Sequence, residues 1–115
     1  MQTTQLLVEL IRNKHQVLMQ LREIGRRQAN IVMGGDVDAV LKLLAIKQDL
    51  ISSLQEIERQ LTPYFREDPD RRTWPSPIAR DDCARLAAEC NALLAEIVQL
   101  EKLGAEKMKI GRAHV

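Results

Sequence analysis

The chain has 115 residues, of which 45% are hydrophobic, 3% aromatic and 29% charged, with a formal net charge of +1. This length predicts one domain with a mainly aliphatic core, and the balanced charge argues against a nucleic-acid-binding protein, which usually carries a basic excess. The sequence has no run of about 18 apolar residues, so we expect no membrane insertion.

Apolar residues recur at steps of three and four from about residue 4 to residue 33, which is the period of one face of a helix. Gly34-Gly35 supplies a turn after this helix, and Asp36 is a good N-cap for a second helix over about 37–61. Two long helices joined by so short a turn predict an antiparallel hairpin. The apolar positions of the two helices are Leu7, Leu10, Ile11, Val17, Leu18, Leu21, Ile24 and Ile31, then Val37, Val40, Leu41, Leu44, Ile51, Leu54, Ile57 and Leu61.

Residues 62–76 predict a connector, because prolines and all three aromatic residues of the chain concentrate there. We expect the aromatic side chains Tyr64, Phe65 and Trp74 to hold this connector on the end of the bundle. Ser76-Pro77 then starts a third helix, with serine as the cap and proline at the first helical position.

The third helix is predicted over about 77–109, where two apolar rows repeat every seven residues. One row is Cys83, Cys90, Ile97 and Gly104, and the other is Leu86, Leu93 and Leu100. Two helical cysteines seven residues apart are about 10 Å apart along the axis, too far for a disulfide, so we expect reduced core thiols. The expected fold is therefore all-α: one domain (1–115) containing a helical hairpin and a third long amphipathic helix in a coiled-coil-like bundle.

The apolar face of the third helix is wider than one partner requires. It spans roughly 200°, against the 100° or so that covers a core. A two-helix hairpin leaves part of this arc uncovered, which predicts contact with another chain. That chain is a client protein or a second copy, unless the C-terminal segment is merely frayed. The predicted partner-binding residues are Leu93, Leu94, Ile97, Val98, Leu100, Leu103, Met108 and Ile110.

The residues that carry chemistry do not combine into a catalytic, cofactor or metal site. His15 has no ligand at metal-site spacing nearby, and Gly34-Gly35 precedes an acidic cap instead of a phosphate loop. Small all-helical chorismate mutases bind a dianion through cations on long helices. Arg12, Arg26, Arg27 and Lys47 could fill that role, but Arg26-Arg27 follow the polar side of the helix. We therefore expect a protein that is not an enzyme.

The first 61 residues resemble the FlgN-type flagellar export chaperones, with a long helix, a turn of small residues plus an acid, and a leucine-rich second helix carrying a lysine. The resemblance lies in Leu6-Leu7, Leu10, Leu21, Gly35-Asp36, Val40, Leu43-Leu44, Lys47, Leu50 and Leu54. One departure is that no aromatic residue follows Trp74.

This resemblance implies a cytoplasmic chaperone of the bacterial flagellum. Such a protein binds the C-terminal helices of hook-associated (hook-filament junction) proteins, prevents their premature assembly and delivers them to the type III export apparatus. In that family the C-terminal amphipathic helix binds the client, which here falls on the wide apolar face. The alternative is a homo-oligomeric helical scaffold without a client, and a chorismate-mutase-like enzyme is a distant third. The first residues, which lack the basic and apolar stretches of a secretory signal, also favour the cytoplasm.

Overall fold

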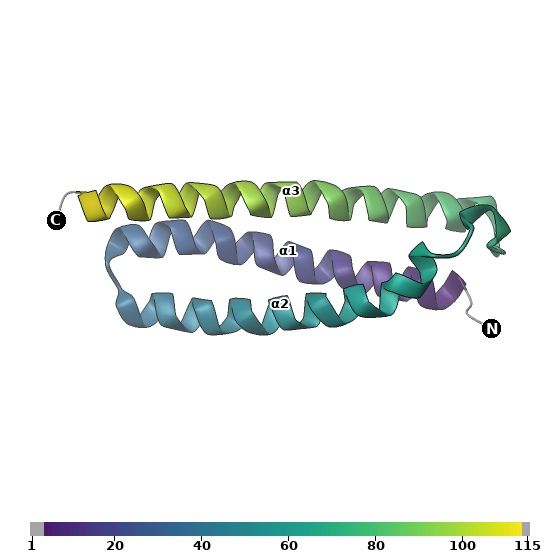
Figure 1. Ribbon diagram of the computed structural model, residues 1–115, viewed down its shortest axis with the longest axis horizontal. Coiled ribbons are helices and arrows are strands. Elements are labelled where there is room, and N and C mark those ends of the chain that lie inside the picture. Colours follow the sequence, from purple (N-terminus) through teal and green to yellow (C-terminus); the bar gives the residue numbers. More distant parts are fainter. Residues whose placement is uncertain (1–3, 114–115) are drawn as a thin grey trace.

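The computed structural model describes residues 4–113, and within this range the side chains of 32–33 and 104–113 are not described. It contains three α-helices: α1 (Thr4–Gly34), α2 (Val37–Phe65) and α3 (Pro77–Ala113). A short 3-10 turn, η1 (Pro69–Arg71), lies between α2 and α3. The helices form an elongated bundle in which α3 runs parallel to α1 and α2 runs antiparallel to it (Figure 1). The all-α fold predicted from the sequence is confirmed.

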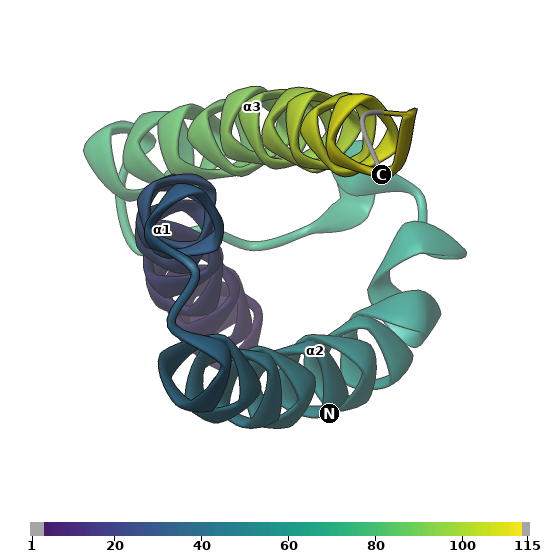
Figure 2. The same cartoon turned by 90° about the vertical axis from the view of Figure 1, so that its left-hand side faces the viewer.

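The first helix is the centre of the bundle, because α2 and α3 both pack against α1 (Figure 2). Among the described residues, no Cα atom of α2 lies within 8 Å of a Cα atom of α3. The two outer helices therefore lie on different sides of α1 and do not pack closely on each other. None of the described helices has a stretch long and apolar enough to cross a membrane.

The hairpin turn between α1 and α2 has the predicted chemistry. Gly35 adopts a φ of +74°, a left-handed conformation that side-chain-bearing residues rarely tolerate. Asp36 then caps α2, since its Oδ1 accepts a hydrogen bond of 3.1 Å from the backbone N–H of Ala39.

The second helix is longer than predicted. It continues through Pro63 to Phe65, four residues past the expected end at Leu61. A proline inside a helix normally costs a backbone hydrogen bond. Here the side chain of Tyr64 is buried in the core, and that packing holds the last turn in helical form. The connector consequently shrinks to residues 66–76.

The connector is held by polar contacts at both ends. The Arg72 guanidinium donates to the carbonyl of Tyr64 at 2.5 Å, and the Thr4 hydroxyl donates to the carbonyl of Thr73 at 2.9 Å. Of the three aromatic residues, Tyr64 is buried and Trp74 packs against the core, as expected. Phe65 differs, because it is 67% exposed.

The core joins all three helices and is densest near the connector. Its most buried side chain is Leu18 of α1, with no exposed surface. Cys83 and Cys90 are buried and free, as predicted. The buried cluster is Leu7, Leu10, Ile11, Leu18, Leu21, Leu61, Tyr64, Cys83, Cys90 and Leu93.

Candidate protein-interaction surface

One side of α3 forms its seam with α1. Cys90 and Leu93 are buried there, and Ile97 packs against the same core. Leu100 extends the seam, because it lies against Gly25 of α1: a Cβ atom added at Gly25 would be 3.2 Å from the Leu100 Cδ1. Leu93, Ile97 and Leu100 were predicted to bind a partner, and in the isolated chain these residues pack α3 on α1.

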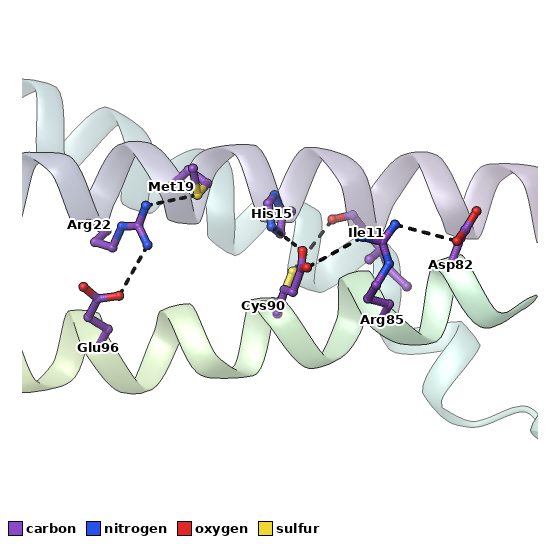
Figure 3. A network of polar contacts seen from close by, with 9 residues as sticks. Ile11, His15, Met19, Arg22, Asp82, Arg85, Cys90 and Glu96 are labelled. Atoms are coloured by element: carbon purple, nitrogen blue, oxygen red, sulfur yellow. Dashed lines mark hydrogen bonds and ion pairs between the residues drawn. The ribbon is translucent and has the colours of Figure 1, made fainter. Parts of the chain in front are cut away.

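A row of polar contacts between ionisable side chains follows one edge of this seam. The His15 Nε2 lies 3.0 Å from a carboxylate oxygen of Glu89. Farther along, the Glu96 carboxylate forms ion pairs with two guanidinium groups of α1, with N–O distances of 2.7 Å to Arg26 and 3.4 Å to Arg22. Figure 3 shows His15 and Arg22 of α1 directed toward α3. His15 is thus paired across the helices, which its local sequence did not indicate.

The contacts with Arg26 and Arg22 change the pKa of Glu96. The hydrogen bond from Arg26, together with the charges of Arg26 and Arg22, lowers the pKa of the Glu96 carboxyl below its ordinary value of 4.5. A carboxyl whose pKa is lower in the folded chain favours folding above its unfolded pKa, and that contribution is lost as the pH falls through the folded value. The ion pairs of Glu96 therefore stabilise the α1–α3 contact near neutral pH, and this stabilisation is lost when Glu96 is protonated in acid.

We expect the Glu96→Gln variant to lose part of the acid dependence of stability. Thermal unfolding followed by circular dichroism at about pH 6 and about pH 3 measures this dependence. The Glu96→Gln variant should have the smaller difference in Tm between the two conditions. Glu23→Gln is the matched control, because Glu23 pairs with Arg27 of its own helix. An unchanged Tm difference in Glu96→Gln would contradict the assignment.

The opposite edge of α3 faces α2. Lys47 of α2 forms an ion pair with Glu101 of α3, which links the two outer helices at this level. Lys14 of α1 pairs with Glu58 of α2 at 3.0 Å. Both lysine side chains are mostly buried, whereas both carboxylates are more than 40% exposed.

The remaining predicted partner-binding residues fall into three groups. Leu94 is half-buried and packs against the core. Val98 and Leu103 are 51% and 44% exposed, so they are accessible in the isolated chain. Met108 and Ile110 lie outside the described side chains. The accessible part of the predicted site therefore begins at Val98.

A second group of exposed apolar residues, not predicted as a binding surface from the sequence, lies at the start of α2. The Lys47–Glu101 pair sets the two helices side by side at this level, and because α2 and α3 run in opposite directions, the start of α2 lies alongside the part of α3 that follows Glu101. We call the combined group the hairpin-end surface. It consists of Val37, Leu41, Leu44 and Ile46 of α2 with Val98 and Leu103 of α3, all more than 40% exposed. The signal was present in the sequence, since apolar residues between 37 and 46 occupy more than one helix face.

The four cations considered for a dianion site are distributed along the bundle. Arg26 pairs with Glu96, Arg27 with Glu23, and Lys47 with Glu101. Arg12 lines a separate pocket of about 290 Å³ near the connector, where the walls are formed by α1, the Trp74-Pro75 segment and Ala79. Across the part of the chain that the structure describes, no three His, Cys, Asp or Glu residues could jointly hold a metal ion.

No protein-family model matches this chain, and comparisons with curated proteins and with solved structures give no match either.

Proposed function

We propose that this chain is an export chaperone of the FlgN type. It holds the C-terminal amphipathic helices of hook-associated proteins in the cytoplasm until the flagellar type III export apparatus takes them. The resemblance of residues 1–61 to that family supports this proposal. The physical support is the hairpin-end surface.

The hairpin-end surface is the observation that carries the proposal. Six large aliphatic side chains remain exposed near one end of a bundle whose core is densest at the other end. Exposed apolar side chains that gather on one region commonly mark a protein-binding site. Both α2 and α3 contribute side chains to this surface.

The mechanism would be coupled folding and binding. A client segment that is disordered alone gains an apolar surface on which to form a helix, and its own apolar stripe is then hidden from other copies. Burying an aliphatic side chain is worth about 1.5 to 3 kcal/mol. A few such contacts are sufficient for micromolar binding after the entropic costs of association.

The direct test is a titration of the purified chain with a synthetic C-terminal peptide of a hook-associated protein. We expect saturable heat in calorimetry at about micromolar affinity. Circular dichroism should show more helix in the mixture than in the separate components, because the peptide folds on binding. A scrambled peptide of the same composition is the control.

A homo-oligomeric scaffold without a client is the alternative. A scaffold would show neither binding heat nor gained helix with the authentic peptide, and its mass in light scattering would not respond to it. That pattern would reject the chaperone proposal.

A further inference from the structure

The helices leave one position of a four-helix bundle without a helix. Each outer helix packs on α1, and α2 and α3 are too far apart to pack directly on each other. In a three-helix bundle with every pair in contact, neighbouring axes would be only 8–10 Å apart. If α1 occupies one corner of a square, α2 and α3 occupy the two corners next to it and are diagonal to each other. The fourth corner, diagonal to α1, lies between them.

The edges that face this corner carry apolar residues beside an ion pair. The Lys47–Glu101 pair identifies them, because its two side chains meet between α2 and α3. Leu44 and Ile51 are three and four residues from Lys47, and Val98 is three residues from Glu101, so each shares a helix face with the ion pair. None of the three is fully buried.

The third helix also carries a second heptad row, separate from its seam with α1. The row is Ala87, Asn91, Leu94 and Val98, with steps of four, three and four. At 100° per residue it lies about 110° around the helix from the α1 seam. That angle suits a helix with neighbours at two adjacent corners, and the second neighbour is absent from the isolated chain.

Around most of its circumference, the middle part of α3 carries no charged residue. Between residues 83 and 100 the only charged residues are Arg85, Glu89 and Glu96, and they fall within about 40° of the helix circumference. Glu89 and Glu96 pair with α1. An exposed helix face normally carries charges, so the rest of this circumference fits contact with protein.

One added helix in the fourth corner would cover only one of the free sides of α3. A second copy of the chain supplies two neighbours for it. We propose that two copies form a six-helix dimer in which the α3 of each copy fills the fourth corner of the other. This inference concerns the chain alone and does not rest on the export proposal.

The geometry determines the direction of the paired helices. A two-fold axis parallel to the long axis of the bundle sets the α3 helices of the two copies side by side. It also places the partner copy's α2 against the uncharged side of α3 that lies opposite α1. A two-fold axis perpendicular to the bundle is excluded, because it would place the partner copy's α1 in the position already occupied by α2. The α3 helices therefore run parallel, and each Asn91 meets its counterpart. A single asparagine within an apolar row favours one register and two strands.

Engineered cysteines test the contact and its direction. In oxidising conditions Asn91→Cys and Val98→Cys should each give a disulfide-linked dimer of the full chain, because a parallel pair places equal residues together. Ala45→Cys, at an exposed position of α2, should stay monomeric, as should the natural chain with its buried thiols. Cross-linking at Asn91 alone would indicate an antiparallel pair and overturn the arrangement. Cross-linking at neither position would overturn the interface.

A charge substitution provides the second measurement. In light scattering the natural chain should dimerise as its concentration rises. Asn91→Arg should raise the dissociation constant of the dimer at least about 100-fold, because two cations then face each other at the two-fold axis. Ala45→Arg, the matched control, should leave it unchanged, and circular dichroism checks that both variants stay helical. A natural chain that remains monomeric, or a dimer that tolerates Asn91→Arg, would refute the proposal.

Discussion

Leu18→Ala should lower the free energy of unfolding by about 3 to 5 kcal/mol. Leu18 has no exposed surface and belongs to the cluster that joins α1, α2 and α3. Removing three carbon atoms there leaves a cavity that rigid neighbouring helices fill only partly. Urea unfolding followed by circular dichroism measures the change.

The neighbouring Met19→Ala variant is the control, because Met19 is 41% exposed and its truncation should cost less than about 1 kcal/mol. Domains of this size are commonly stable by only 5 to 15 kcal/mol, so the Leu18 variant should lie close to unfolding. Equal losses at the two positions would contradict the burial of Leu18.

The core is uneven along the bundle, and this connects stability to the proposed binding surface. The buried cluster extends to the connector end, where it includes Leu61 and Tyr64 of α2 and Cys83 of α3. At the hairpin end, α3 is held mainly by Leu100 against Gly25 and by ion pairs. A bundle with this distribution is anchored at one end and leaves the other available for contact with another chain.

Periodicity was sufficient to predict the helices, and the turn and capping residues were sufficient to predict the hairpin and the caps. Asp36 and Ser76 act as expected, since each side chain accepts a hydrogen bond from the backbone N–H three residues on. The end of α2 was wrong, because a local proline rule was applied to Pro63 while the burial of Tyr64 depends on contacts with residues far away in sequence.

The exposure of the predicted partner-binding residues could not be derived from the sequence, for a related reason. A helical pattern gives the angle of each side chain around its own axis, and it does not state which sector the rest of the chain covers. Leu93 and Val98 belong to the same wide apolar arc, yet α1 covers Leu93 and leaves Val98 half exposed. The contribution of α2 was missed because Val37, Leu41 and Leu44 were assigned to the hairpin seam and Ile46 was assigned to no surface.

If the hairpin-end surface binds a client helix, the double variant Leu41→Asp/Leu103→Asp should weaken peptide binding at least about 100-fold. Each leucine contributes about 1.5 to 3 kcal/mol when buried, and 1.4 kcal/mol corresponds to a tenfold change in affinity. Burying an unpaired carboxylate adds a further cost. Calorimetric titration with the hook-associated peptide measures the loss. Both leucines are exposed in the isolated chain, so circular dichroism should show an intact fold.

The matched control is Phe65→Asp/Ile78→Asp, which introduces the same two charges at exposed apolar positions near the connector. This variant should bind the peptide as the natural chain does, because both positions lie at the other end of the bundle. Equal weakening in the two double variants would mean that net charge, and not the location of the apolar surface, governs binding. Undiminished binding by Leu41→Asp/Leu103→Asp would place the client elsewhere. The client surface and the dimer interface share Leu44 and Val98, which both double variants leave unchanged, so a loss of client binding with an intact dimer would show that the client needs Leu41 or Leu103 and the dimer needs neither.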